Sequence, residues 1–114
     1  MKKKILIVDD DKSFVNKILD SCPECRHIFS IADSLNRAKY LLSNDSFDII
    51  LANVKIPGGS SIELKSQIDL SVSKTNFLFM SNLEEDHDLI SNYGEKCYYK
   101  YDFDSSLKVY LENA

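Results

Sequence analysis

Polar side chains that could hold a divalent cation or an oxyanion follow several apolar runs of this 114-residue chain. The set consists of Asp9 and Asp10 after residues 5–8, Asn53 after residues 47–52, Ser81 after residues 76–80, and Lys100 at the end of residues 97–100. Carboxylate and amide oxygens are ligands for hard cations, whereas a hydroxyl and an ammonium group suit an oxyanion. Carboxyl ends of parallel strands meet in one crevice, so the spacing predicts a single polar site.

Short apolar runs alternate with amphipathic segments along the chain, and this alternation predicts the elements that position the polar set. Strands are expected at residues 5–8, 27–32, 47–52, 76–80 and 97–100. Helices are expected after Ser13, after Asp33 or Ser34, after Ser60 or Ser61, over residues 84–93, and after Asp104, with a loop at residues 57–59. The predicted fold class is α/β: a doubly wound five-stranded parallel sheet with five helices. The run 47–52 is apolar except for Asp48, and such near-continuous hydrophobicity is typical of a central strand covered on both faces.

Length and charge limit the function classes that the chain can serve. A chain of 114 residues with 44% hydrophobic residues fits one domain with its own core, over residues 1–114. The net charge of −4 disfavours direct contact with nucleic acid, which needs clustered Lys and Arg. No apolar run is long enough to span a membrane. The basic start at residues 1–4 leads into only four apolar residues, so the sequence favours a cytoplasmic protein over an exported one.

Cys22 and Cys25 form a C-x-x-C unit that could be a redox pair or half of a zinc site. A redox C-x-x-C usually opens a helix, whereas this one follows a predicted helix. A tetrahedral zinc site needs four ligands, and only His27 adds to the two cysteines locally. Incidental loop cysteines are the favoured interpretation, and a redox or metal role stays open. The odd count of three cysteines suits a reducing cytoplasm.

With these residues and this order of elements, nearly the whole chain resembles the receiver domains of two-component response regulators, which have a flavodoxin-like fold. The resemblance implies that Asp9, Asp10, the side chain at position 53 and the backbone carbonyl of Lys55 surround Mg²⁺. It also implies that Ser81 and Lys100 contact a phosphoryl group. In that family the residue at position 53 is the aspartate that accepts the phosphoryl group. The family carries signals and is not a class of enzymes in the usual sense.

This chain departs from the family pattern most clearly at Asn53, which is a neutral amide and cannot form an acyl phosphate. The loss of one charged ligand weakens a magnesium site by about ten- to a hundredfold, so the metal site is expected to be weak or vestigial. Further departures from the pattern are Ser61, Asn82, Cys97 and Tyr101. Together they predict a degenerate pseudo-receiver that signals by protein contact and not by aspartyl phosphorylation.

The resemblance also implies a partner surface made of the last two helices and the fifth strand. That surface would carry Tyr93, Tyr98 or Tyr99, and Tyr110, and aromatic side chains are enriched at interfaces. We expect an effector domain, another protein partner or a second copy of the chain to bind there. Whether the domain stands alone or belongs to a longer regulator, and which kinase or partner it serves, stays open.

Two alternative functions stay open. The chain could be an ordinary Mg²⁺-dependent receiver in which Asn53 is an engineered replacement for the phosphoacceptor aspartate. Alternatively, the segment from Asp9 to Ser13 loosely resembles the opening motif of haloacid-dehalogenase-like phosphatases, with Asp9 as nucleophile and Asp11 as general acid. That alternative is disfavoured because only scattered acids follow Lys100, where those enzymes hold magnesium.

Overall fold

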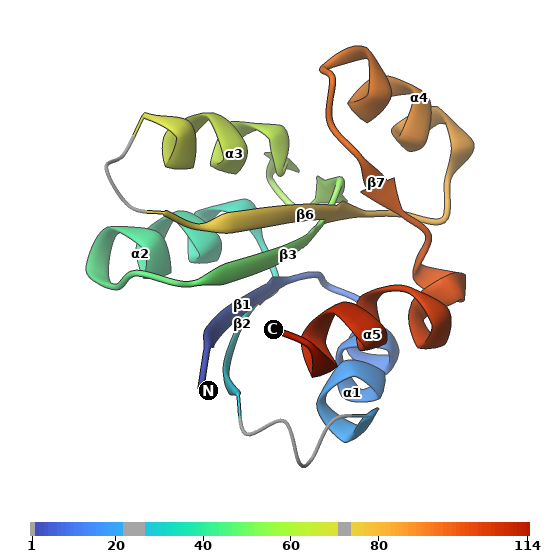
Figure 1. The fold of residues 1–114 in the computed structure, drawn as a ribbon. Coiled ribbons are helices and arrows are strands. Elements are labelled where there is room, and N and C mark those ends of the chain that lie inside the picture. Colours follow the sequence, from blue (N-terminus) through green and yellow to red (C-terminus); the bar gives the residue numbers. More distant parts are fainter. Residues whose placement is uncertain (1, 22–26, 71–73) are drawn as a thin grey trace.

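The computed structural model describes residues 2–21, 27–70 and 74–114. Its main sheet is five-stranded and entirely parallel, with the spatial order β2-β1-β3-β6-β7 (Figure 1). The strands are β1 (Lys4–Val8), β2 (Ile28–Ala32), β3 (Ile49–Asn53), β6 (Asn76–Met80) and β7 (Cys97–Tyr98). This sheet confirms the predicted α/β class, and β3 has the central position that its apolar sequence indicated.

Five α-helices lie among the described residues, as the sequence predicted. They are α1 (Lys12–Ser21), α2 (Leu35–Asn44), α3 (Ile62–Asp69), α4 (Glu84–Asn92) and α5 (Leu107–Glu112). Helices α1 and α5 cover one face of the sheet, and α2 and α3 cover the other (Figure 1). None of the helices in the described part is long and apolar enough to cross a membrane.

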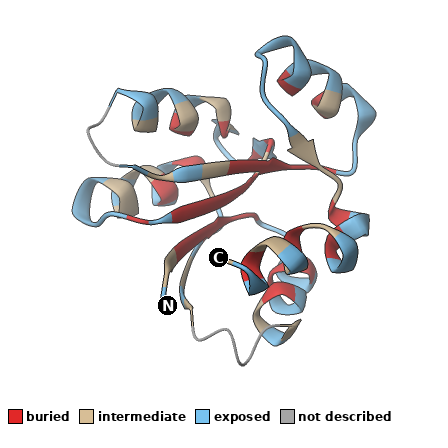
Figure 2. Cartoon of the chain, in the orientation of Figure 1, coloured by how far each residue is buried: buried red, intermediate tan, exposed pale blue. Residues whose placement is uncertain are grey.

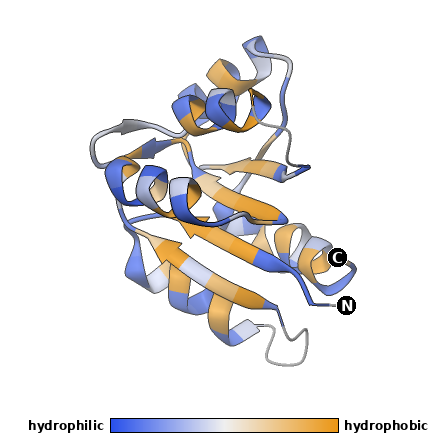
Figure 3. Cartoon of the chain, turned by 90° about the vertical axis from the view of Figure 1, so that its left-hand side faces the viewer, coloured by the Kyte–Doolittle hydropathy of each residue, from blue (hydrophilic) through white to orange (hydrophobic). Residues whose placement is uncertain are grey.

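The core is built from alternate residues of the central strands. Ile5 and Ile7 of β1 pack toward α1 and α5, whereas Leu6 and Val8 pack toward α2 and α3. All four are fully buried, because a strand turns successive side chains to opposite faces and both faces are covered. Figure 2 shows this burial in the middle of the sheet, and Figure 3 shows the same strands as the most hydrophobic part of the chain. The buried strands hold their carboxyl ends in fixed positions.

The last predicted strand is wrong at its carboxyl end. Strand β7 stops at Tyr98, and Lys100 begins a 3₁₀ helix, η1 (Lys100–Ser105). The ladder ends where the Ser81 N–H donates to the Tyr98 carbonyl at 2.9 Å. The chain then turns inward, because Phe103 is fully buried and packs edge-to-face on Phe14 at 5.8 Å. Lys100 therefore enters the crevice from a 3₁₀ helix and not from a strand.

The helix starts also differ from the prediction in two places. Helix α1 begins at Lys12, and the Asp11 carboxylate accepts the Phe14 N–H at 3.2 Å, so Asp11 and not Ser13 is its cap. Asp104 lies inside η1 and does not cap α5, which begins after Ser106 without a side-chain cap. The predicted cap of α2 is confirmed, since Ser34 accepts the Arg37 N–H at 3.1 Å. The cysteine pair at positions 22 and 25 lies outside the described residues.

The segment predicted as a loop after β3 contains a short antiparallel hairpin, β4 (Lys55–Ile56) with β5 (Gly59–Ser60). Its corner is Pro57-Gly58, and Gly58 has φ +95°, a conformation that glycine adopts without steric cost. The Pro57 carbonyl accepts the Leu35 N–H at 2.9 Å, which ties the hairpin to α2. The hairpin thereby fixes Lys55 directly after β3.

Candidate functional site

The structure brings most of the predicted polar residues to the carboxyl edge of the sheet. Asp9 follows β1, Asn53 ends β3 and Ser81 follows β6. Neighbouring strands are in register there, with Val8 opposite Ala52 and Asn53 opposite Met80. The crevice therefore has two sides. The ion-pair side consists of Asp9, Asp11 and Lys100, and the relay side consists of Asn53, Lys55, Ser81 and Asp86.

A buried ion pair forms the centre of the ion-pair side. The Lys100 ammonium lies 2.7 Å from Asp9 Oδ2 and 3.9 Å from Asp11 Oδ2. Asp9 Oδ2 makes no aligned hydrogen bond, but at this distance from an ammonium group it is electrostatically paired. Asp9 Oδ1 accepts the Asp11 N–H at 3.0 Å. The lysine also lies over the Phe14 ring, 4.6 Å from its centre, where cation–π attraction adds to the pairing.

The amide of Asn53 is turned to its own loop. Asn53 Nδ2 donates to the Lys55 carbonyl at 2.7 Å. This carbonyl is the one that the resemblance assigns to Mg²⁺. Only the amide nitrogen can serve as donor to a carbonyl, so this contact fixes which end of the side chain faces Lys55. An aspartate at position 53 could not make the same contact, because an ionised carboxylate has no donor.

Ser81 is held by a residue that the sequence analysis did not select, Asp86. The Ser81 hydroxyl donates to Asp86 Oδ2 at 2.6 Å and accepts the Leu83 N–H at 3.0 Å. Both Ser81 and Asp86 are only 2% exposed. Asp86 belongs to an acidic segment whose composition suggests a solvated helix, so only the spacing of a serine five residues before an acid could have signalled the contact.

Lys55 connects the hairpin to α4 through its side chain. The ammonium lies 2.9 Å from Glu85 Oε1 and 3.4 Å from Asp86 Oδ1. Its pKa is raised, chiefly because it donates a hydrogen bond to Glu85 and also because the Asp86 charge favours the protonated form. The backbone carbonyl of Lys55 thus contacts Asn53, whereas its side chain contacts the first turn of α4.

Asp10 is exposed and takes part in neither set of contacts. It lines a hollow of about 380 Å³ beside β2 and α1, together with Asp9, Lys12 and Arg37. The hollow is thus lined by groups of both charges.

The residues present fit a magnesium ion poorly. Mg²⁺ needs six oxygens in a near-ideal octahedron and usually takes one or two carboxylates from the protein. Here the carboxylate of Asp9 is paired with Lys100, and the Lys55 carbonyl accepts the Asn53 amide. Nowhere in residues 2–21, 27–70 and 74–114 do three His, Cys, Asp or Glu side chains group as metal ligands do.

The predicted aromatic partner surface is divided by the structure. Tyr99 stacks on His87 with ring centres 3.6 Å apart, and Tyr101 lies 4.8 Å from Tyr99. The Tyr99 hydroxyl donates to Glu84 at 2.7 Å, which raises the pKa of this tyrosine to about 12. We call His87, Tyr99, Tyr101 and exposed Leu83 the aromatic face.

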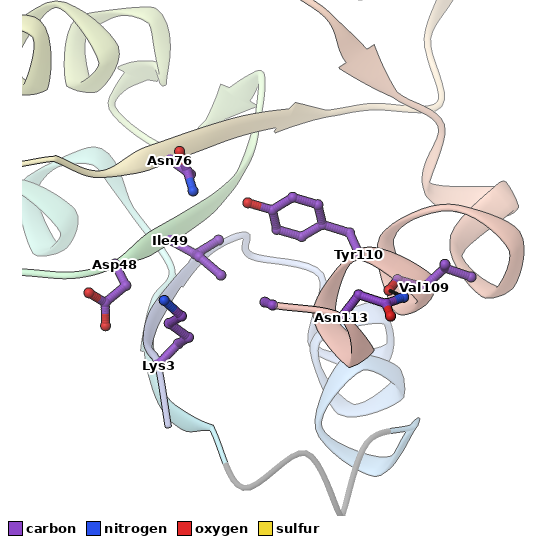
Figure 4. A pocket seen from close by; sticks show the side chains of 8 residues that line it. Lys3, Asp48, Ile49, Asn76, Val109, Tyr110 and Asn113 are labelled. Carbon is purple, nitrogen blue, oxygen red and sulfur yellow. Dashed lines mark hydrogen bonds between the residues drawn. The ribbon is translucent and has the colours of Figure 1, made fainter. Parts of the chain in front are cut away.

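The other predicted tyrosines lie elsewhere. Tyr93 lines a groove between α3 and α4, and Tyr98 packs against the core that α1 and α5 cover. Tyr110 lines a hollow of about 360 Å³ at the amino-terminal edge of the sheet, next to Asn76 (Figure 4). Burial raises the pKa of Tyr110. This hollow is at the opposite end of the strands from the crevice.

Cys97, one of the departures from the family pattern, has a thiol that stays protonated at physiological pH. The residue is half-buried in β7, and burial raises its thiol pKa to about 12, with the Asp86 charge adding to the effect. Its side chain packs beside Phe79 and Ile90 in a small apolar cluster under α4.

Comparison with solved structures identifies the class of fold. A receiver domain (CheY-like) of a response regulator from Methylobacillus flagellatus superposes with a TM-score of 0.80 at 17% identity, covering 99% of this chain and 98% of that one. The response regulator TrrA from Thermotoga maritima, in complex with Mg²⁺-BeF, gives a TM-score of 0.78 at 18% identity, with 97% of both chains covered. No protein-family model and no curated protein matches the sequence.

The chain thus has the fold of response-regulator receiver domains. DrrB from Thermotoga maritima, an OmpR/PhoB homologue, matches with a TM-score of 0.73 and 20% identity over 99% of this chain, but only 54% of DrrB is covered. At such identities the likeness establishes the fold and leaves the chemistry to the residues themselves.

Proposed function

We propose that residues 1–114 form a single receiver-like domain that acts in signal transduction by protein contact and not by aspartyl phosphorylation. The observation that carries this proposal is the contact from Asn53 Nδ2 to the Lys55 carbonyl at 2.7 Å. The residue at the phosphoacceptor position is a neutral amide whose donor is already used. The receiver fold supplies the frame, and the polar residues at its crevice supply the link to this class.

The neighbouring carboxylates do not readily replace the missing nucleophile. Asp9 is buried and forms an ion pair with Lys100, and Asp86 is buried and accepts a hydrogen bond from the Ser81 hydroxyl. A carboxylate that is paired in this way must break its contacts before it can attack phosphorus. The same pairing supports weak or vestigial Mg²⁺ binding, with Asp10 and the amide oxygen of Asn53 as the remaining candidate ligands. No enzymatic turnover is proposed.

The aromatic face is the proposed partner surface. It combines exposed Leu83 and Tyr101 with the stack of Tyr99 on His87, next to the acids of α4. Aromatic side chains supply large contact areas at a low cost in conformational entropy. The proposed partner is a cytoplasmic protein, an effector domain or a second copy of the chain, in contact with α4, β7 and η1. Nucleic acid and membrane are not proposed partners.

An ordinary receiver with an introduced asparagine at position 53 is the second candidate. It is favoured by the retention of Asp9, Ser81 and Lys100 around the crevice. The two candidates differ in whether the aspartate form of this chain accepts a phosphoryl group.

Phosphorylation with acetyl phosphate tests both candidates. The protein with Asn53 is expected to gain no phosphate by intact-mass spectrometry, with or without Mg²⁺. The Asn53→Asp variant serves as the matched sample: rapid, hydroxylamine-sensitive labelling of that variant would favour the ordinary receiver. Hydroxylamine-sensitive phosphate on the protein with Asn53, mapped for example to Asp10, would contradict the proposed function.

A further inference from the structure

We propose that Asp86 is a built-in anion of this crevice. Its carboxylate accepts a hydrogen bond from the Ser81 hydroxyl and faces the ammonium of Lys55. Asp86 therefore occupies the contacts that an external oxyanion would need on the relay side. This inference rests on the proposed function, because it states what fixes Ser81 and α4 in a domain that forms no acyl phosphate at Asn53.

The burial and distances at Asp86 carry the argument. Asp86 is 2% exposed although it is an acid in the first turn of a surface helix. Its Oδ2 accepts the Ser81 hydroxyl at 2.6 Å, a length typical of a hydrogen bond to a charged oxygen. Its Oδ1 makes no hydrogen bond to any described residue, and the nearest cation is Lys55 at 3.4 Å. A buried carboxylate with one oxygen that accepts no hydrogen bond lowers the stability of the fold, unless its other contacts compensate for the lost solvation.

Helix capping alone does not account for this arrangement. An acid in the third position of a helix ordinarily accepts the N–H of the capping residue, here Leu83. In this chain the Leu83 N–H donates to the Ser81 hydroxyl at 3.0 Å, and the hydroxyl in turn donates a hydrogen bond to Asp86 at 2.6 Å. The one donor of the Ser81 hydroxyl and one of its two acceptor lone pairs are therefore used. We call this chain of contacts the Ser81 relay.

The relay competes directly with any external anion. An oxyanion that enters the crevice would need the Ser81 hydroxyl proton, which points to Asp86, and the Lys55 ammonium, which is neutralised by Glu85 and Asp86. A tethered carboxylate acts at a high effective concentration, so a free ligand competes poorly. A hydrogen bond to a charged group corresponds to about a ten- to a hundredfold difference in affinity.

The same contacts couple the end of β3 to α4. The Asn53 amide holds the backbone of Lys55, and the Lys55 side chain reaches the first turn of α4. Ser81 closes the loop from β6 to the same turn. The position of α4 is thereby set by residues of this chain, independent of phosphoryl donors.

The test is a titration of inorganic phosphate into isotope-labelled protein, followed by the NMR shifts of the Ser81 and Lys55 amides. In Asp86→Ala the relay is open, and phosphate is expected to bind at least tenfold more tightly than to the unaltered protein. Asp88→Ala is the matched control, since it removes an exposed acid of the same helix, and it should behave as the unaltered protein does. Glu85→Gln removes one of the two charges beside Lys55 and should shift the Lys55 resonance without moving the Ser81 resonance.

Amide exchange gives a second readout. Asp86→Ala should speed exchange in α4 by at least tenfold relative to α2, whereas a loss of overall stability would speed both alike. Should Asp86→Ala fail to fold, Asp86→Val removes both the acceptor for Ser81 and the charge while filling a similar volume, and the same comparison applies to it. Equal phosphate affinity in the unaltered protein and in the folded Asp86 variant would overturn the proposal. Labelling of the unaltered protein by acetyl phosphate would instead contradict the proposed function, and the two failures are therefore distinguishable.

Discussion

The two sides of the crevice satisfy their polar groups in different ways. On the ion-pair side, the acid at the end of β1 meets a lysine from η1 in a buried contact of 2.7 Å between Asp9 and Lys100. On the relay side, the strand end is the neutral Asn53, and the buried acid comes from α4 as Asp86. One side keeps the strand-end carboxylate, and the other has a carboxylate on a helix instead.

Under the proposed function, this difference indicates how a receiver fold could keep a polar crevice without aspartyl phosphorylation. Buried charge needs a partner, and each buried acid of the crevice has a lysine within reach: Lys100 for Asp9 and Lys55 for Asp86. Stability and phosphotransfer are therefore separable requirements. Substitutions on each side test whether the two sides differ in their contribution to the free energy of unfolding as they differ in geometry.

The largest expected effect is the loss of Lys100. Lys100→Met leaves Asp9 buried without its cation, and breaking a buried pair in this way costs about 3–5 kcal/mol in the free energy of unfolding. Urea denaturation measures the change. Adding Asp9→Asn to Lys100→Met should recover much of it, because the uncompensated charge is gone.

The control for this prediction is Lys17→Met. Lys17 is exposed and lies 3.9 Å from Asp104, so its loss should stay within about 0.5 kcal/mol. A Lys100→Met variant that unfolds at the same urea concentration as Lys17→Met would show that the ion-pair side is not a buried pair.

The second prediction concerns the relay side. Asn53→Asp removes the donor to the Lys55 carbonyl and sets a carboxylate against it, which should lower the free energy of unfolding by about 1–3 kcal/mol without metal. Mg²⁺ should then restore about 2.7 kcal/mol at a hundredfold excess over its dissociation constant, since it binds the folded form. Thermal-shift titration with MgCl₂ measures both effects.

Asn53→Ala is the matched control, because it also loses the hydrogen bond but adds no ligand. It should be destabilised and should not respond to magnesium. If Asn53→Asp and Asn53→Ala gave the same magnesium titration, the crevice residues would not form even a latent metal site, and the receiver likeness would be one of fold alone.

The third prediction separates capping from pairing on the ion-pair side. Asp11 accepts the Phe14 N–H at 3.2 Å and lies 3.9 Å from the Lys100 ammonium. Asp11→Ala should cost about 1 kcal/mol, the usual value for a helix cap. Ser13→Ala should cost nothing measurable in the same urea experiment, because Ser13 is exposed inside α1. The reverse order would restore Ser13 as the cap.

The fold followed from local signals because they agree with the tertiary structure. The apolar run at residues 49–52 lies in the buried strand β3, and Ser34 both has the sequence of a cap and serves as one. The signals failed where a distant contact decides the local geometry. Lys100 is predicted as the end of a strand, but β7 ends two residues earlier, at Tyr98, and the chain turns into η1 at Lys100, where it buries Phe103.

The candidate site was predictable as a set of residues and not as a network. Asp9, Asn53, Ser81 and Lys100 stand out because polar residues at strand ends are rare without a use. Asp86 does not stand out, since an acid in the first turn of a helix is ordinarily a solvated partner of the helix dipole. Its burial depends on the packing of α4 over Ser81, which no local pattern encodes.

The smallest expected effect lies on the outer face of the relay side, where α4 presents Glu84 to Tyr99. The Tyr99 hydroxyl donates to Glu84 at 2.7 Å, and an ionised phenol would lose that bond and face a carboxylate, so its pKa rises to about 12. Because this folded-state pKa is above the ordinary tyrosine value of 10.0, the contact stabilises the fold fully below pH 10 and loses its effect as the pH rises toward 12. An NMR titration of ring-labelled tyrosine should place the Tyr99 midpoint near 12. Glu84→Gln should move that midpoint back toward 10, whereas Glu85→Gln, whose carboxylate contacts Lys55, should leave it in place. If Glu84→Gln left the Tyr99 midpoint unchanged, Glu84 would not contact Tyr99, and the first turn of α4 would not be held against the end of β7. The contrast between Asp86, which points into the crevice, and Glu84, which points to the outer face, would then fail.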